Sequence, residues 1–419
     1  MVGEHYMKET GKNRQIFREG DFLIPYPKDL PLWPVIAVDQ YTSQPEYWEK
    51  IAENVGEAPS SLHCVFPEVY LGDTDLDEIR QIHRQMKTYL SAGLFREFAD
   101  SYIYIERTVS SGKIRKGILG CIDLEAYDYA DFTDLPIRAT EKTVTERLPS
   151  RIAIREGAPM ELSHVILLCD DEKKQLIESI DPSKLPLIYD LELMAKGGHI
   201  RGWLLSGKDA EAFDERLNQY YEDKKGHSLL FAAGDGNHSI ASAKEVYEKL
   251  KQSHPDEDYT GRPQRYMTVE LENIHDPIQV FEPIHRIMYQ VDPVHVLQKL
   301  KEERGDESGT EVPWYSSAQS GIIKIDISDS GYAAGTVQKF LDRYMSLYGG
   351  EIDYIHDRDN LVSLCGRSET VGFELPPLDN SAFFSTIEKN GVYVRKTFSI
   401  GESDDKRYYL EARRITEEI

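Results

Sequence analysis

The sequence predicts an α+β fold, with a mixed sheet at the core and a smaller α/β subdomain. Three observations predict it. Apolar runs typical of strands alternate with helical periodicity. Hairpin signals such as Ser110–Lys113 interrupt this alternation, which favours a mixed sheet over a doubly wound one. A chain of 419 residues is also too long for one simple core. We expect a main domain over 1–285, a subdomain over 286–371, and a segment over 372–419 that returns to the main domain.

The expected elements follow in chain order. Val35–Asp39 is an apolar run that leads into a polar loop, and apolar residues near one helical face follow from Leu76 to Leu90. Asp292 and Pro293 have the residue types of a helix start. We expect further strands at 102–109, 117–124, 162–169, 185–193, 200–205, 229–233, 265–271 and 321–327, and helices at 172–180, 209–221, 240–250, 337–348 and 359–365.

Composition narrows the function classes. A formal net charge of −24 argues against a broad nucleic-acid surface, because such surfaces depend on Lys and Arg. The four cysteines are far apart, which indicates reduced cytoplasmic thiols and neither a zinc site nor a disulfide framework. No apolar run approaches the roughly 20 residues that span a bilayer, and residues 1–10 lack the apolar core of a signal peptide. We expect a cytoplasmic protein that binds a small molecule, with no nucleic-acid or membrane partner.

The stretch from Ser228 to Leu250 carries the strongest functional signal. It reads as a buried strand, a tight loop and a helix, with Gly234, Asp235 and Gly236 in the loop. Asn237 or Ser239 is expected to cap the helix. A helix N-terminus binds anions, and His238 at its mouth titrates near neutral pH. The simpler alternative is a structural turn, because these residue types are also common in turns.

Other polar residues are candidates for the same site. Asp39 ends the first expected strand, where ligand contacts are common, although it also suits a plain strand terminus. Arg147, Arg151 and Arg155 are spaced to share one helix face, either as an anion-binding wall or as a solvated face paired with nearby glutamates. Those glutamates are Glu141, Glu146 and Glu156.

Two further segments hold basic residues. His199 and Arg201 follow a Gly-Gly turn, which is either a second anion-binding loop or a hairpin tip. Lys396 stands in a basic and aromatic stretch near the C-terminus.

Several blocks together resemble the uncharacterised bacterial family known as domain of unknown function ten-fifteen. They run from near one end of the chain to the other. The blocks are Ala37–Thr42, Ile137–Glu141, Gly197–Gly202, Gly234–Ser239, Phe281–Arg286 and Arg395–Ser399.

The central loop is also similar, more distantly, to the signature loop of the ParB and sulfiredoxin superfamily. Members bind nucleotides, and one branch phosphorylates free serine. Asp235, Gly236 and His238 match that loop, whereas Ser239 stands where the superfamily usually has arginine. The resemblance implies ATP or ADP with Mg²⁺ as ligand. Arg201 or Arg151 is a candidate to supply the missing charge.

Three functions follow from these observations. The first is a nucleotide-dependent phosphotransferase for a small polar metabolite such as a free amino acid, in which His238, Asp235 and Asp39 act in catalysis. Its expected ligand-binding residues are Gly234, Gly236, Asn237, Ser239, His199, Arg201, Arg151 and Lys396. The alternative is a regulatory protein that binds a nucleotide or metabolite without turnover. A metal-dependent hydrolase is disfavoured because the sequence shows no clustered metal ligands, and we expect no metal site.

Overall fold

The computed structural model describes residues 16–73 and 76–416. The contacts between residues divide the chain into two compact units, and each is described by itself. The first unit contains the described residues up to Ala139, then Thr143–Gln279, and the segment from Glu402 onward. The second unit contains Thr140–Lys142 and Val280–Gly401.

This division differs from the predicted ranges 1–285, 286–371 and 372–419 mainly in where residues 372–401 belong. That segment makes its contacts inside the second unit. Strand β19 (Phe398–Ile400) pairs there with β13 (Phe281–Pro283). The residues from Glu402 onward do belong to the first unit.

The first unit is built on a large mixed sheet, which confirms the prediction of a mixed sheet. Among the described residues it has thirteen strands, and its main path runs β5-β6-β11-β8-β12-β4-β3-β2-β20-β7. Strand β1 pairs with β4, and β10 joins β3 to β9. The strands are β1 (Phe17–Arg18), β2 (Gly20–Pro25), β3 (Phe95–Thr108), β4 (Ile114–Asp123), β5 (Tyr127–Asp128), β6 (Ile137–Ala139), β7 (Met160–Leu162), β8 (Ile166–Cys169), β9 (Leu187–Glu192), β10 (His199–Ser206), β11 (Phe231–Asp235), β12 (Tyr266–Asn273) and β20 (Ala412–Arg414).

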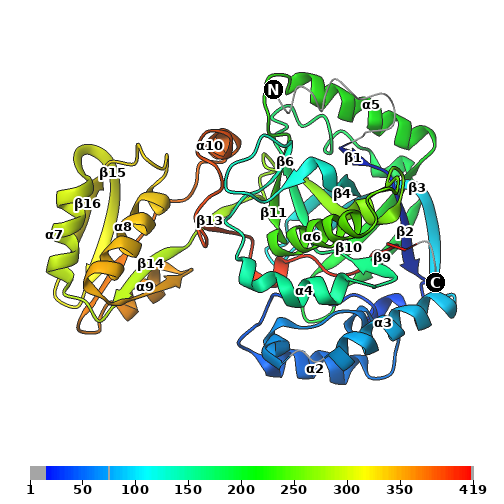
Figure 1. Cartoon of the computed structure of the whole chain (residues 1–419), viewed down its shortest axis with the longest axis horizontal. Helices are drawn as coiled ribbons and strands as arrows, with labels where there is room; N and C mark the ends of the chain where they lie inside the picture. Colours follow the sequence, from blue (N-terminus) through cyan, green and yellow to red (C-terminus); the bar gives the residue numbers. More distant parts are fainter. Residues whose placement is uncertain (1–15, 74–75, 417–419) are drawn as a thin grey trace. The chain divides into compact units, whose positions relative to one another are not determined.

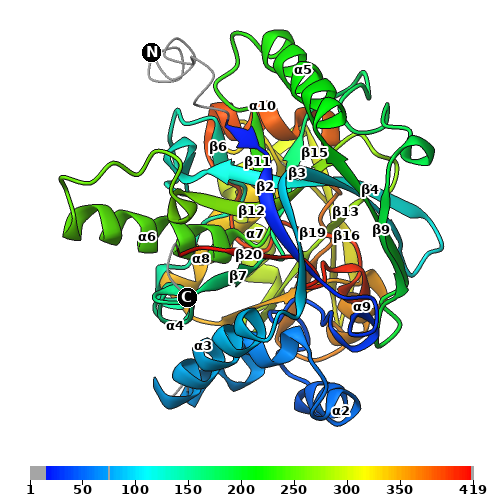
Figure 2. The ribbon, with the colours of Figure 1, turned by 90° about the vertical axis from the view of Figure 1, so that its right-hand side faces the viewer.

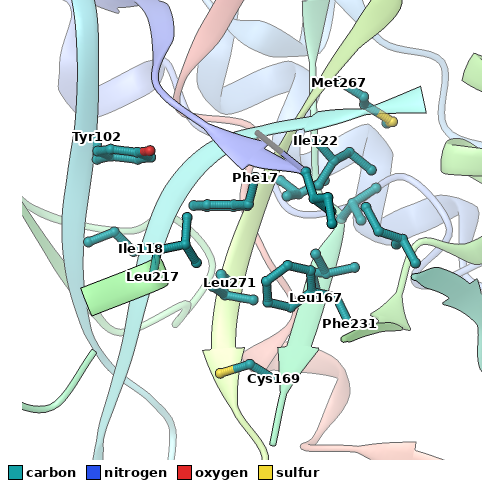
Figure 3. Close-up of a cluster of buried hydrophobic side chains, with 14 of the residues drawn as sticks. Phe17, Tyr102, Ile118, Ile122, Leu167, Cys169, Leu217, Phe231, Met267 and Leu271 are labelled. Carbon is teal, nitrogen blue, oxygen red and sulfur yellow. The ribbon is translucent and has the colours of Figure 1, made fainter. Parts of the chain in front are cut away.

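Helices cover this sheet because each of its two faces is apolar. Successive side chains of a strand point to opposite faces, so Tyr102 and Tyr104 enter one buried cluster, whereas Ile103 and Ile105 enter another. The first cluster includes apolar residues of α5 and α6 (Figures 1 and 3). The second includes residues of α2. The helices of this unit are α2 (Pro45–Val55), α3 (Leu76–Ser91), α4 (Leu148–Arg155), α5 (Lys208–Asp223) and α6 (Asn237–Ser253).

The second unit has a five-stranded antiparallel sheet in the order β16-β15-β18-β14-β17 and the two-stranded pair β13-β19. Buried residues of α7 and α8 pack with this sheet in one core. Asp292 caps α7 through the N–H of Val294, as its residue type predicts. The elements are β14 (His285–Tyr289), β15 (Gly305–Ser316), β16 (Ser320–Ile325), β17 (Glu351–Ile355), β18 (Thr370–Phe373), α7 (Pro293–Arg304), α8 (Ala333–Tyr348), α9 (Arg358–Leu364) and α10 (Phe383–Asn390).

Three expected elements take a different form. The segment 172–180 is not a helix, because the Asp171 carboxylate accepts hydrogen bonds from two backbone N–H groups of that segment and holds it in turns. The expected strand at 162–169 is split into β7 and β8, which pair with different neighbours. Val35–Asp39 forms a single bridge, Ile36 with Tyr408, and then turns at Asp39.

Within the described part of the chain, no helix combines the length and apolar character needed to cross a membrane. Residues 1–15, on which part of the signal-peptide expectation rests, lie outside that part.

Candidate functional site

The loop between β11 and α6 lies beside the split between β7 and β8. Strand β11 pairs with β6 in parallel and with β8 in antiparallel direction, and its register against β8 shifts between Ala233 and Asp235. Gly234 occupies this irregularity. Figure 2 shows α6 from the side, leaving the sheet after β11. The predicted strand, loop and helix are therefore confirmed as structural elements.

Gly236, and not Asn237 or Ser239, is the N-cap of α6. Its φ of 76° and ψ of 26° are left-handed, a conformation that glycine adopts readily. A Cβ at this position would lie 2.9 Å from Cγ2 of Val165 and 3.4 Å from Nε2 of His164. The loop therefore needs a residue without a side chain, and no N-cap side chain binds the first turn of the helix.

Asp235 connects this loop to the C-terminal segment. Its Oδ1 accepts a hydrogen bond from the N–H of Gly236 at 2.8 Å, and its Oδ2 lies 3.2 Å from Nζ of Lys406. Both side chains are largely buried. This ion pair places one cation next to the start of α6.

Buried arginines position Lys406. Arg107 is 1% exposed, and it donates hydrogen bonds to the carbonyl oxygens of residues 404 to 406. Arg115 also donates to the carbonyl of Asp405 at 2.8 Å. Arg407 donates to the carbonyl of Ser163, the residue before His164, and it pairs with Glu270. These bonds fix the segment from both sides of Lys406.

Asp39, His164 and Tyr409 form the second part of the site. Nε2 of His164 lies 3.7 Å from Oδ2 of Asp39, and its Nδ1 lies 2.9 Å from Oη of Tyr409. That Oη accepts a hydrogen bond from the N–H of Val38 at 3.5 Å. The tyrosine hydrogen is then available to Nδ1, so we assign the imidazole proton to Nε2, which faces Asp39.

The surroundings of Asp39 favour its ionised form. Burial by itself would raise the pKa of this carboxyl, but His164, the amide of Gln40 and the charge of Lys406 together hold the pKa below its ordinary value. The Asp39 side chain is 27% exposed. It is therefore an accessible carboxylate at neutral pH.

Arg151 also lies at this site, and it pairs with a glutamate other than the three that the sequence suggested. It pairs with Glu68, which begins the 3-10 helix Glu68–Asp73, and its charge acts on Asp39. Arg155 pairs with Glu161 at 2.6 Å, and Glu156, one of the expected partners, pairs with Lys249. The side chain of Arg147 lies outside the described residues.

His238 is held by the backbone. Its Nε2 accepts a hydrogen bond from the N–H of Val144 at 3.2 Å, which places the proton of the neutral ring on Nδ1. Its carbonyl accepts a hydrogen bond from Ser242 at 2.7 Å. Asn237 donates from its amide to the carbonyl of Ala233 at 3.5 Å. The side chain of His238 is therefore oriented by a bond that protonation of Nε2 would break.

The remaining predicted residues lie elsewhere in the structure. His199 pairs with Asp190 at 2.8 Å on β10. Arg201, on the same strand, pairs with Glu106 at 2.9 Å. Lys396 belongs to the second unit, where its N–H donates to the carboxylate of Glu141. A ligand-binding role for these three residues stays a prediction.

A pocket that is partly open to solvent adjoins the start of α6. Its polar wall includes His164, Ser239, Tyr409 and Arg151, and the rest is mostly apolar. All lining residues belong to the first unit. They are Val38, Cys64, Val65, Phe66, Glu68, Met86, Arg151, Ile154, Arg155, Ala158, Met160, Glu161, Leu162, His164, Ser239, Ser242, Met267, Tyr409 and Ile415.

One group of three potential metal ligands is found in the described part of the chain, and it lies at the other end of β8. It consists of Asp170, Glu172 and His275. Asp170 follows the end of β8, whereas Asp235 pairs with its start at Ile166. None of the three residues lines the pocket.

Sequence reasoning missed His164, Lys406 and Tyr409. His164 stands in an apolar run that predicts an unbroken strand, so no local signal marks it. The segment 406–410 is visibly basic and aromatic, but nothing local relates it to a loop about 170 residues earlier.

One protein-family model matches most of the chain. The model of the family described as "Protein of unknown function (DUF1015)" matches residues 23–362. The chain belongs to this family. A search of curated proteins found no match.

Three solved structures to which the chain is similar have low sequence identity to it. SbnI with C-terminal truncation from Staphylococcus aureus is 10% identical, with 71% of this chain and 87% of that chain covered and a TM-score of 0.39. A conserved hypothetical protein from Pyrococcus furiosus is 12% identical, with 68% and 90% covered and a TM-score of 0.35. Free serine kinase in complex with AMP is 12% identical, with 70% and 91% covered and a TM-score of 0.39. At these values the comparisons carry no argument about the ligand of this chain.

Proposed function

We propose that this DUF1015 protein is a nucleotide-dependent phosphotransferase that acts on a small hydroxylated metabolite such as a free amino acid. One observation carries the proposal: an ionised carboxylate, Asp39, and its neighbour His164 adjoin a glycine-capped helix N-terminus. Phosphoryl transfer requires mainly positioning and neutralisation of charge. The proposed ligand is ATP or ADP, accompanied by Mg²⁺.

The start of α6 supplies the proposed phosphate site. Backbone N–H groups and the positive end of the helix dipole attract anions there. Ser239 adds a hydroxyl to the pocket wall. The similarity of Asp235, Gly236 and His238 to the ParB and sulfiredoxin loop supports a nucleotide as the anion. Ser239 departs from the usual arginine, and Lys406 and Arg151 are the proposed replacements for its charge.

Asp39 is the proposed general base. As the acceptor hydroxyl oxygen forms a bond to the terminal phosphorus, Asp39 accepts the hydroxyl proton, and the bond to the leaving nucleotide phosphate breaks with its electron pair. His164 and Tyr409 orient the carboxylate. Asp235 is the proposed neighbour of Mg²⁺, through water, and the ion would neutralise phosphate charge. His238 is the proposed donor to the phosphates through Nδ1.

The second candidate is a regulatory protein that binds a nucleotide or metabolite without turnover. The ion pairs of Lys406 with Asp235 and of Arg151 with Glu68 favour it, because both cations are already neutralised. We propose a cytoplasmic location for either candidate function. The four cysteines are buried free thiols, which is typical of a reducing compartment.

A thermal-shift screen tests the proposal and separates the two candidates. The ligands are ATP, ADP, CTP and GTP with Mg²⁺, alone and with free amino acids, followed by ³¹P NMR to detect a phosphorylated product. A ligand that binds only the folded protein stabilises it by about 2.7 kcal/mol at a hundredfold excess over its Kd.

Two histidine variants serve as the matched pair in this screen. His238→Ala is expected to abolish the shift, and His275→Ala, at the other end of β8, to keep it. A shift without product would favour the regulatory candidate. The absence of any shift with the wild-type protein would overturn both nucleotide-binding candidates.

A further inference from the structure

The pocket extends from the polar start of α6 into an apolar cluster. Cys64, Met86, Ala158, Met160 and Ile415 line the pocket and also belong to one buried hydrophobic cluster. At the other end, His164 lies against Gly236, and Tyr409 bonds to His164. The pocket therefore joins two chemically different environments, and any ligand that fills it contacts both.

The polar groups of the inner wall are engaged with one another. Glu161 is 4% exposed and pairs with both Arg155 and Arg413, and the N–H of Thr268 donates to it at 2.8 Å. These cations hold the pKa of Glu161 at about 2 against the opposing effect of burial, so it stays ionised and closed on its partners. This part of the wall offers a polar ligand little to bind.

From this geometry, we infer that the acceptor substrate has a hydroxyl-bearing head and an apolar body. The inference rests on the proposed function for the identity of the head. The hydroxyl lies beside His164 of the pocket wall and points toward Asp39, 3.7 Å beyond it, and the body enters the apolar cluster. An adenine ring is the less favoured occupant, because reading its edge needs available polar groups. Three lining methionines, Met86, Met160 and Met267, suit a hydrocarbon body of variable shape because their side chains are flexible.

A substrate series with a constant head tests the inference. Threonine, β-hydroxynorvaline, β-hydroxyleucine and β-phenylserine share the amino acid head and a secondary β-hydroxyl, and their apolar bodies increase in size. Each buried CH₂ contributes about 0.8 kcal/mol, which corresponds to about a fourfold gain at 1.36 kcal/mol per tenfold. We expect kcat/KM to rise along the series by about that factor per carbon. A flat or falling series in an active enzyme would overturn the inference.

Variants of the inner wall provide a second test. Ala158→Leu adds volume to the apolar end and is expected to reduce kcat/KM for β-phenylserine at least tenfold, with little change for threonine. Met86→Ala enlarges the same end and is expected to shift the preference toward the larger substrates. Met288→Ala truncates a buried methionine in the second unit. It is the matched control, and it should leave the preference unchanged.

Binding without turnover separates failure of the inference from failure of the proposed function. Valine, leucine and phenylalanine have no β-hydroxyl, and we expect them to raise the thermal stability of the wild-type protein in that order. Ala158→Leu should remove the response to phenylalanine. If no phosphoryl transfer occurs but this ordered response is seen, the pocket assignment stands and the phosphotransferase proposal fails.

The adenine alternative has its own outcome. If Ala158→Leu weakens the binding of ATP or ADP and leaves the amino acid response intact, the apolar end holds the base. The inference about the acceptor would then be wrong.

Discussion

The two ends of strand β8 hold the same residue types in two different arrangements. At its start, His164 lies 3.7 Å from Asp39, and Lys406 pairs with a different carboxylate, Asp235. At its other end, Nε2 of His275 lies 2.6 Å from Asp170, and Lys224 pairs with that same carboxylate. The strand between them has four residues, which corresponds to about 13 Å.

The comparison indicates why we propose the start of β8, and not its other end, as the ligand-binding site. Asp170 pairs with both its histidine and its lysine, so the charges of these three side chains are paired within one group. At the start of β8 the charges are spread over two carboxylates, the histidine lies 3.7 Å from Asp39 and bonds to Tyr409 instead, and the histidine lines the pocket. Residue types alone do not distinguish these two ends. The start of β8 is distinguished by the adjoining pocket and by the neighbouring N-terminus of α6.

The largest expected effect is a loss of kcat. If this loss is not observed, the proposed difference between the two ends of β8 is wrong. Asp39→Asn removes the proposed base and keeps the shape of the side chain. General base catalysis typically contributes 10²–10⁴-fold, so we expect kcat to fall by about that factor in a ³¹P NMR or coupled assay. Asp170→Asn is the matched control and should change kcat by less than about twofold. Equal losses in both variants would contradict the assignment.

The next effect concerns the left-handed glycine of the loop. Gly236→Ala forces a Cβ against Val165, and the left-handed conformation adds a cost of about 1–2 kcal/mol to about 1–3 kcal/mol of overpacking. We expect the free energy of unfolding in urea to fall by about 2–5 kcal/mol. Gly261 has a similar φ of 79°, and a Cβ added there would meet nothing within 4 Å, so Gly261→Ala isolates the conformational cost alone. A difference of zero between the two variants would show that the loop has space for a side chain.

A smaller effect, on the free energy of unfolding, is expected at low pH. The carboxylates at the two ends of β8 behave alike in this respect. Burial opposes the effect, but the partners of Asp39 and Asp170 hold both pKa values below the ordinary value in the folded protein. The unfolded chain then binds more protons as the pH falls. The stabilisation is fully present above about pH 4 and is lost below it. We expect Asp39→Asn and Asp170→Asn each to weaken the dependence of unfolding free energy on pH between 6 and 3. A variant with an unchanged pH profile would show that its carboxylate is not stabilised in the fold.

The smallest effect tests the orientation of His164. Tyr409→Phe keeps the ring and removes the hydroxyl that bonds to Nδ1. The loss of one hydrogen bond costs about 0.5–1.5 kcal/mol, so we expect a reduction of kcat by about tenfold or less, with KM nearly unchanged. The conservative control is Tyr259→Phe, in which the lost hydroxyl bonds to carbonyls at the end of α6. If Tyr409→Phe raises KM and leaves kcat unchanged, Tyr409 has no orienting role.

Local signals in the sequence were enough to predict the elements that carry the loop. The apolar run at 229–233 and the glycines after it predict a strand and a turn, and the structure has β11 and α6 there. The hairpin around Ser110–Lys113 was also predicted correctly, with β3 and β4 paired on either side. In both cases the pattern and the turn residues are neighbours in the chain.

Long-range pairing limited the prediction of the site. Asp39 was proposed from a strand end, but the strand is a single bridge, and the partner residues 407–409 fix its position. The segment 172–180 shows how a side chain can override periodicity. Its Leu176, Ile177 and Ile180 are buried as a helix would bury them, yet Asp171 binds the backbone and prevents the helix.

The central claim is that a phosphate-bearing ligand binds at the start of β8 and not at its other end. Histidine side-chain NMR tests it most directly, because the chain has twelve histidines and single His→Asn variants assign their signals. On titration with ADP or ATP and Mg²⁺, we expect the signals of His164 and His238 to shift and those of His275 to stay in place. Shifts confined to His275, with His164 and His238 unchanged, would contradict the account.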